Sequence, residues 1–237
     1  MTTLNGLQSS YPYGMINHMD DIKNQDKENQ DKKNQDNRKK TPVVTILLIA
    51  LNVCIWAALD FFGDTQSAVY IASYGGLYPT LVLEGEWYRL FTAAFLHFGA
   101  EHLANNMILL GAAGSKLEQV AGSLKYLLIY IGAGLAGNLL SLFIMLYTKD
   151  YAVCAGASGA VFGIIGALLW TVIKNRGRLE ELTVKGLLFM LALSFYNGVT
   201  AEGIDNWAHL GGAIGGFFLC MLFYRTKRRR FYKTSLK

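Results

Sequence analysis

Ser158 and His209 are the two residues whose type and surroundings could do chemistry. Each is a polar residue inside a long apolar stretch, Ser158 within residues 156–159 (GASG) and His209 within residues 208–212 (AHLGG). Reactive and ionisable groups at membrane depth are costly to bury, so they generally mark functional sites. A serine and a histidine on separate segments suggest a nucleophile and its general base. The sequence therefore predicts a serine hydrolase built inside a membrane.

Glycines accompany both residues at helical spacing. Gly159 follows Ser158 directly, and Gly212 and Gly216 follow His209 on its own segment. Small residues four positions apart let two membrane helices approach backbone to backbone. A hydrogen bond between a serine and a histidine on two helices, at about 3 Å, requires such an approach. The alternative is that Ser158 is a packing residue and His209 a structural hydrogen-bonding group.

Three further groups could stabilise the negative charge that develops during acyl transfer. Ser158 opens its apolar segment, and the first turn of a helix has backbone N–H groups without partners. His102 and Asn106 are four residues apart, which puts both on one helix face, and both can donate hydrogen bonds. Together with the N–H of Ser158 they could form an oxyanion site. The alternative for this pair is a structural link between helices.

No acidic residue is placed to orient His209. Asp205 lies four residues earlier, near the boundary of the segment, where we expect it to cap the helix N-terminus. A Ser158–His209 dyad is therefore the simpler prediction. Phe162, one helical turn after Ser158, could hold the imidazole by stacking, or it could simply be a core residue. His97 is interpreted as structural.

These residues must be positioned by membrane helices, because the chain is 52% hydrophobic and only 16% charged. A span needs about 20 mostly apolar residues. We expect an all-α polytopic membrane protein with six transmembrane helices. The six predicted spans are residues 43–62, 90–114, 123–147, 157–173, 184–200 and 207–224.

The positive charges predict how these spans are oriented. All but two of the 22 lysines and arginines, Arg89 and Lys149, fall on one predicted side of the membrane. Cytoplasmic loops carry the excess of such residues, so both termini should be cytoplasmic, in the plasma membrane of a cell. We expect a disordered polar tail at residues 1–40, a membrane domain at 41–225 and a basic tail at 226–237.

The distribution of positive charge also indicates the class of partner. A net charge of +5 and a pI near 9.0 could indicate nucleic acid, but the basic residues flank apolar spans, so the expected partner is the lipid bilayer. The three cysteines give neither a disulfide framework nor a metal-ligand spacing. No metal or cofactor is expected.

The ordered set of motifs from Glu86 to Gly216 resembles the rhomboid family of intramembrane serine proteases. The motifs are H-x-x-x-N at 102–106, GASG at 156–159 and A-H-x-x-G-x-x-x-G at 208–216, in the order of the family. The six spans and cytoplasmic termini look like the basic bacterial form of this fold. The family has a Trp-Arg pair before its second span, whereas this chain has Trp87-Tyr88-Arg89.

The resemblance implies roles for the motif residues. Ser158 would attack the peptide carbonyl, and His209 would act as the base. His102, Asn106 and the N–H of Ser158 would hold the oxyanion, with Phe162, Gly156, Gly159, Gly212 and Gly216 in support. Substrates would be single-span membrane proteins cut near the outer face, with access beside spans two and five and a gate formed by span five and residues 197–206.

Two other functions remain compatible with these residues. Histidine and asparagine inside a membrane can line the polar path of a transporter or channel. The sequence shows no inverted repeat and no paired broken helices, which argues against a transporter. A rhomboid-like protein that binds membrane clients without cutting them is the second alternative.

Overall fold

The computed structural model describes residue 25, residues 41–200 and residues 203–224, and in these ranges it is mostly helical. The tails predicted at residues 1–40 and 226–237 lie outside the described residues, apart from residue 25. The helices and strands follow in this order: α2 (Val43–Phe62), α3 (Ala68–Ser73), α4 (Pro79–Leu83), α5 (Arg89–Thr92), η1 (Ala93–Phe95), α6 (Gly99–Leu109), η2 (Leu110–Gly114), α7 (Ser115–Ala121), α8 (Ser123–Thr148), α9 (Ser158–Lys174), β1 (Arg178–Leu179), β2 (Leu182–Thr183), α10 (Val184–Thr200) and α11 (Asn206–Phe223).

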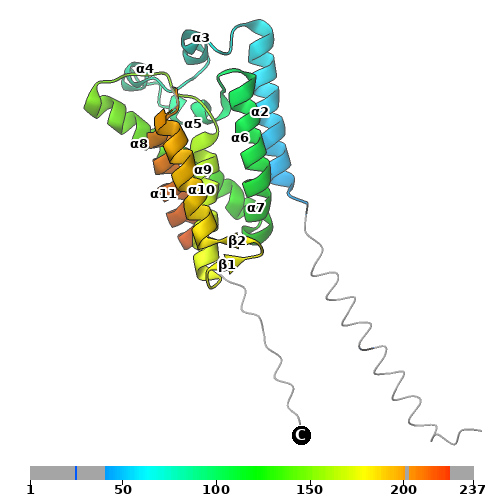
Figure 1. Ribbon diagram of the computed structural model, residues 1–237. Coiled ribbons are helices and arrows are strands. Elements are labelled where there is room, and N and C mark those ends of the chain that lie inside the picture. Colours follow the sequence, from blue (N-terminus) through cyan, green and yellow to red (C-terminus); the bar gives the residue numbers. More distant parts are fainter. Residues whose placement is uncertain (1–24, 26–40, 201–202, 225–237) are drawn as a thin grey trace, which may run out of the picture. The chain divides into compact units, whose positions relative to one another are not determined.

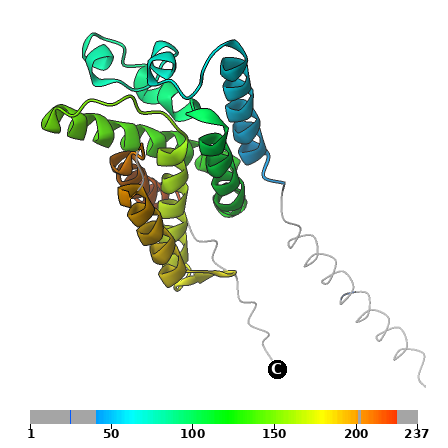
Figure 2. The same cartoon turned by 45° about the horizontal axis from the view of Figure 1, so that its top comes forward.

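Helix α9 lies at the centre of this bundle. It has α6 on one side and α10 and α11 on the other, and α2 lies beyond α6 (Figures 1 and 2). The side chains of α9 are apolar or small all round, and most of them are buried. A helix that is apolar on every face is stable only where other elements enclose it. The element that begins with Ser158 is therefore the most enclosed helix of the fold.

Three of the described helices, α2, α8 and α11, are long and apolar enough to cross a bilayer. Helices α9 and α10 are also apolar but shorter, with apolar stretches at Ser158–Lys174 and Val184–Tyr196. The helix ends agree with the predicted spans within one residue at α2, α8, α9, α10 and α11. The structure thus agrees with an all-α membrane protein, while the count of six spans stays a prediction.

The structure differs from the prediction at the second span. We expected one continuous segment over residues 90–114, but the chain forms α5 and η1 first and then breaks before α6. Phe98 is extended, and Gly99 has a φ of +71°, a left-handed conformation that glycine adopts without strain. From Gly99 the chain is helical through the π-helical turn η2 to the end of α7. The break places His97 outside the helix that carries His102.

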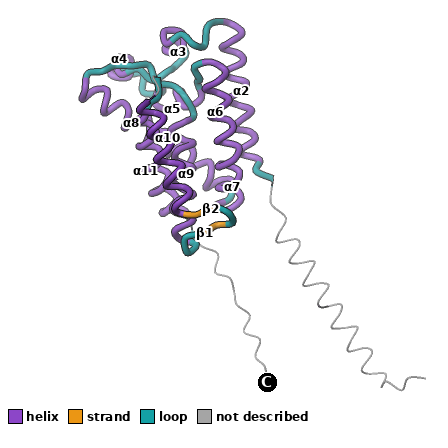
Figure 3. The backbone as a smooth tube through the Cα atoms, in the orientation of Figure 1, coloured by secondary structure: helices purple, strands orange, loops and turns teal. Residues whose placement is uncertain are grey.

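The two ends of the described bundle differ in structure. Helices α3, α4 and α5 gather at one end with the loop that precedes α9, and the antiparallel hairpin β1–β2 lies at the other with α7 (Figures 1 and 3). At this second end a buried carboxylate, that of Glu118, accepts hydrogen bonds from the N–H groups of Val44 (3.0 Å) and Thr45 (2.8 Å). These N–H groups open α2 and have no partner within the helix, so Glu118 ties α2 to α7.

Candidate active site

Ser158 is the first residue of α9, so the N–H groups of the first turn lie beside its side chain. The two residues before it hold the loop in place. The N–H of Gly156 donates to the carbonyl of Ala93 (2.9 Å), and the N–H of Ala157 donates to Nε2 of His97 (3.3 Å). Backbone and side chain from the segment before α6 therefore fix the position of the serine.

Only glycine fits at position 156. Its φ is +142°, and a Cβ atom there would lie 2.8 Å from Cε1 and 3.0 Å from Nε2 of His102. The same Cβ position is 3.7 Å from Oγ of Ser158. The imidazole of His102 and the hydroxyl of Ser158 thus flank one backbone position, which brings two of the predicted site residues together.

The backbones of α9 and α11 are in direct contact through their glycines. A Cβ atom on Gly212 would lie 1.9 Å from the carbonyl oxygen of Gly159, and one on Gly216 would lie 1.9 Å from that of Gly163. Backbone atoms cannot move aside as a flexible side chain can. The contact that the glycine spacing predicted therefore exists along the helix pair that carries Ser158 and His209.

His209 stacks on Phe162. The ring centroids are 4.0 Å apart and the ring planes differ by 6°. Both residues are buried, and Phe162 lies one turn along α9 from Ser158. The stack fixes the imidazole plane relative to the helix that carries the serine.

The ring nitrogens of His209 are not held by a protein partner in the described part of the chain. Nδ1 is buried without a hydrogen bond there, and no hydrogen bond joins the ring to Oγ of Ser158. Asp205 accepts a hydrogen bond from the N–H of Ala208 (2.9 Å), so it caps α11 as expected. Hydrogen bonds of a catalytic pair are often long in the free enzyme and shorten with substrate bound.

His102 and Asn106 share one face of α6, but they are used differently. The His102 ring lies beside Gly156, as described above, and at 5.4 Å from the His97 ring in an edge-to-face arrangement. Nδ2 of Asn106 donates to the carbonyl of His102 (3.0 Å). Asn106 is buried, and this bond occupies one of the two N–H groups of its amide. The second N–H could donate a hydrogen bond to an oxyanion.

An apolar cavity of about 560 Å³ opens beside His209. It lies between α10 and the pair α9 and α11. Its lining residues are Phe162, Leu191, Ala192, Phe195, Tyr196, His209, Leu210 and Ala213. In the described residues, no group of three or more His, Cys, Asp or Glu side chains is arranged to hold a metal ion. The site offers a hydroxyl, two imidazoles, an amide and backbone N–H groups.

Comparison with known proteins identifies the family. The model of the rhomboid domain matches residues 84–226, which is more than half of the chain. The chain is 34% identical over 190 residues to the putative rhomboid protease YdcA of Bacillus subtilis, covering 80% of this chain and 92% of that protein. The chain belongs to the rhomboid family.

Other rhomboids match the chain over different shares of their length. Rhomboid protease GluP of Bacillus subtilis is 36% identical over 177 residues, which are 75% of this chain but only 34% of that protein. Rhomboid protease AarA of Providencia stuartii is 30% identical over 204 residues, covering 76% of this chain and 72% of AarA. The matched rhomboid domain contains α6, α9 and α11 and hence all the predicted site residues.

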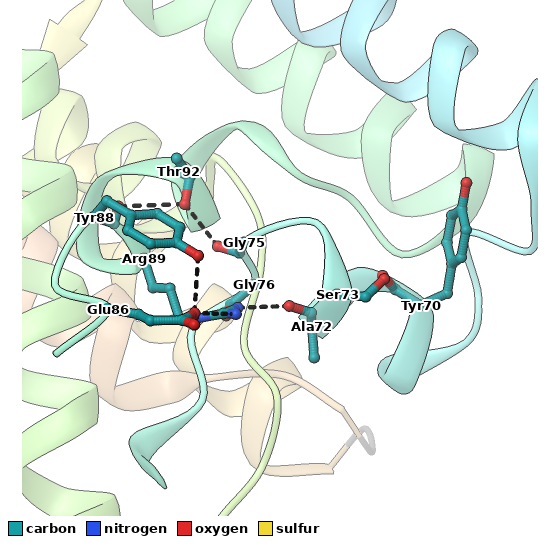
Figure 4. Close-up of polar contacts among 9 residues, drawn as sticks. All are labelled: Tyr70, Ala72, Ser73, Gly75, Gly76, Glu86, Tyr88, Arg89 and Thr92. Carbon is teal, nitrogen blue, oxygen red and sulfur yellow. Dashed lines mark hydrogen bonds and ion pairs between the residues drawn. The ribbon is translucent and has the colours of Figure 1, made fainter. Parts of the chain in front are cut away.

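The motif residue Arg89 is buried in this rhomboid, with contacts that the sequence analysis did not predict. Arg89, 4% exposed, donates to the carbonyls of Ala72 and Gly76 and pairs with Glu86 (Figure 4). The hydroxyl of Tyr88 also donates to Glu86 (2.8 Å). These hydrogen bonds, from Tyr88 first and Arg89 second, hold the pKa of Glu86 below its usual value. The signal in the sequence was a Glu and an Arg three residues apart in a region with few charges.

His97 was correctly interpreted as structural, but its partner could not be predicted. It accepts the N–H of Ala157 across 60 positions of the sequence. The loop before Ser158 has a second such contact, because Leu77 and Cys154 pair through both backbone hydrogen bonds. Neither contact has a sequence pattern of its own. They connect the serine loop of this rhomboid to the segments on either side of α5.

Proposed function

We propose that this protein is an intramembrane serine endopeptidase that uses a Ser158–His209 dyad. The observation that carries the proposal is the stack of Phe162 on His209 at 4.0 Å, on a helix that begins at Ser158 and contacts α11 backbone to backbone. A packing serine and a structural histidine would not need an imidazole whose plane is fixed against the serine helix while its Nδ1 has no described partner. The names of GluP and AarA as rhomboid proteases support the same activity.

In the first half of the reaction, Oγ of Ser158 attacks the carbonyl carbon of the scissile peptide and its proton passes to His209. The protonated imidazole then gives that proton to the leaving amine, and the C–N bond breaks. An ester between Ser158 and the new carboxyl end remains. In the second half, His209 takes a proton from water, which attacks the ester carbonyl. The bond between the acyl carbon and Oγ breaks, and His209 returns the proton to Oγ of Ser158.

The remaining polar residues stabilise the oxyanion. The N–H of Ser158 lies in the first turn of α9, where N–H groups have no partner within the helix, and the His102 ring lies across Gly156 from the serine hydroxyl. Asn106 contributes its second amide N–H after a modest rotation. Donors held in place before the reaction stabilise the developing charge without reorganising, and each is worth about 10²–10³ in rate.

Hydrolysis also requires water and an accessible peptide bond. We propose six spans, cytoplasmic termini and a location in the plasma membrane, which put the loop before Ser158 at the outer face. A helical carbonyl already has a hydrogen-bond partner, so the substrates are single-span membrane proteins whose helix unwinds near that face. The apolar cavity between α10 and α9–α11 supports access beside span five, with α10 as the gate.

The first experiment uses purified full-length protein in liposomes with a fluorogenic substrate that contains one transmembrane segment. Wild type should cleave it, and Ser158→Ala and His209→Ala should each lose about 10³-fold or more, the usual effect of removing a nucleophile or its base. Asp150→Ala, an exposed carboxylate in the outward loop, is the matched control and should cleave like wild type.

The alternatives give different results. Cleavage that survives in Ser158→Ala would exclude the dyad. A protein that binds the substrate but neither cleaves it nor reacts at Ser158 with a fluorophosphonate would be a client-binding rhomboid. A fluorophosphonate adduct on Ser158 without cleavage would leave the dyad standing and reject the substrate tested.

A further inference from the structure

Three segments of the chain, α8, the loop before α9 and the start of α11, meet at one polar cluster. Asp205, the cap of α11, lies four residues before His209. Its Oδ1 accepts the N–H of Ala208, and its Oδ2 accepts the hydroxyl of Ser141 from α8. Ser141 is 2% exposed, and a hydroxyl buried among apolar groups needs such a partner. The carboxylate of Asp205 thus joins α11 to α8.

The same hydroxyl reaches the loop that carries the serine. Sγ of Cys154 lies 3.9 Å from Oγ of Ser141, and Cys154 is four residues before Ser158. Burial raises the pKa of the Cys154 thiol, and the nearby charge of Asp205 raises it further. Cys154 serves as a contact: its backbone pairs with Leu77 on one side while its sulfur meets Ser141 on the other.

Asp205 does not act as the third member of a triad. Both of its carboxylate oxygens have partners other than the imidazole, and Nδ1 of His209 has no partner in the described part of the chain. Its hydrogen bonds therefore act on the position of α11 and not on the imidazole. The α8–α11 contact is tight at this point, because a Cβ atom on Gly137 would lie 2.6 Å from the carbonyl oxygen of Ala208.

We propose that Asp205 and Ser141 are positioning residues for the reaction. Their hydrogen bond fixes the start of α11 against α8, and through Cys154 against the Ser158 loop, so that the imidazole of His209 meets the serine hydroxyl. This inference rests on the proposed function, since it takes His209 as the base. Displacement of a reacting group by about 1 Å can cost about 10²-fold in rate, so a distant hydrogen bond can matter.

The test compares Asp205→Ala, Asp205→Asn and Ser141→Ala with wild type, with Asp150→Ala as control. Asparagine keeps an oxygen that accepts the N–H of Ala208, and its amide N–H can donate to Oγ of Ser141. It therefore preserves the geometry without the charge. For each variant, kcat and KM are measured in liposomes with the fluorogenic single-span substrate. The rate at which a fluorophosphonate labels Ser158 is measured per molecule of folded protein.

We expect Asp205→Ala to lower kcat about tenfold or more, with KM changed less than about twofold and fluorophosphonate labelling lowered in parallel. Asp205→Asn should stay within about threefold of wild type. Ser141→Ala should lie between the two, and the double variant Asp205→Ala/Ser141→Ala should be no worse than Asp205→Ala, because both remove one interaction. If Asp205→Ala does not fold, Ser141→Ala carries the test, since it leaves the cap of α11 intact.

The inference is overturned if folded Asp205→Ala or Ser141→Ala labels at the wild-type rate, or if the loss falls only on KM. It is also overturned if Asp205→Asn loses as much as Asp205→Ala, because the charge would then act directly. Failure of the proposed function gives a separate result: wild type itself neither cleaves nor labels, and the inference falls with it.

Discussion

Helix α9 contacts both α11 and α10, and the two contacts are built differently. Toward α11, glycines bring backbone against backbone, with Gly212 on Gly159 and Gly216 on Gly163. Toward α10, a cavity of about 560 Å³ remains, and Phe189 and Tyr196 on α10 are 67% and 65% exposed. The proposed Ser158–His209 pair lies on the contact that cannot adjust, whereas the α10 side leaves space beside it. A site that must align two side chains and still admit a large substrate needs both kinds of contact.

The largest expected effect comes from adding one methyl group at the tight contact. In Gly212→Ala the new Cβ would lie 1.9 Å from a backbone oxygen, so α9 and α11 must separate. We expect the free energy of unfolding to fall by about 3 kcal/mol or more, as in strongly overpacked cores, and cleavage to be lost as well. Thermal unfolding in detergent and cleavage in liposomes measure the two losses.

Gly111→Ala is the matched control for this substitution. Its Cβ would meet only Cδ1 of Ile49, at 3.7 Å, which is ordinary contact. Alanine should leave stability unchanged or raise it slightly, because glycine costs about 0.5–1 kcal/mol in a helix. Equal losses in Gly212→Ala and Gly111→Ala would mean that the α9–α11 contact is not special.

The next largest difference should appear when one side chain on α9 and one on α10 are truncated. Ile165 of α9 is 2% exposed, so Ile165→Ala should cost about 2–5 kcal/mol through the cavity it leaves. Leu188 of α10 is 50% exposed, so Leu188→Ala should cost less than about 1 kcal/mol. Unfolding midpoints in one detergent compare the two; similar shifts would contradict the difference in packing.

Removing the ring beneath His209 should affect rate more than stability. Phe162→Ala frees the imidazole to rotate, and we expect kcat to fall about 10- to 100-fold, the order that loss of orientation costs. Phe162→Tyr keeps the ring and should stay close to wild type. Steady-state cleavage in liposomes measures both, and a fully active Phe162→Ala would show that the stack does not hold the base.

The smallest effect should appear at low pH, in the segment before α5, at Glu86. Its folded-state pKa is lowered by hydrogen bonds from Tyr88 and Arg89, so its contribution to stability is present above the unfolded pKa and is lost as pH falls through the folded pKa. Glu86→Gln should therefore narrow the difference in unfolding midpoint between pH 7 and pH 3. If Glu86→Gln leaves the difference in unfolding midpoint unchanged, Glu86 does not contribute to the loss of stability at low pH.

The parts of the fold that the sequence predicted are those with a local signal. Apolar runs predicted the ends of α2, α8, α9, α10 and α11 within one residue, because lipid or enclosure requires an uninterrupted apolar helix. The glycine spacing predicted the approach of α9 and α11, because glycines four residues apart can be recognised from the sequence alone. The cap at Asp205 followed from residue type and position alone.

What the sequence did not predict depends on segments far apart in the chain. The break before α6 depends on Gly99 at a φ of +71°, yet the apolar run continues through it. The bonds of Arg89 to the carbonyls of Ala72 and Gly76, and of His97 to the N–H of Ala157, involve backbone groups that every residue has. For the site, the residue types could be named from the sequence, but the partner of Asn106 and the hydrogen bonding of Asp205 to Ser141 could not.

The place of α11 between α8 and α9 has a consequence for biogenesis. A ribosome makes the chain from its N-terminus, and domains of nascent chains fold in that order. Ser158 is synthesised before residue 209, so a nascent chain that ends between them holds the proposed nucleophile without its proposed base. In the proposed mechanism, synthesis and insertion of α11 is therefore the step that completes the site.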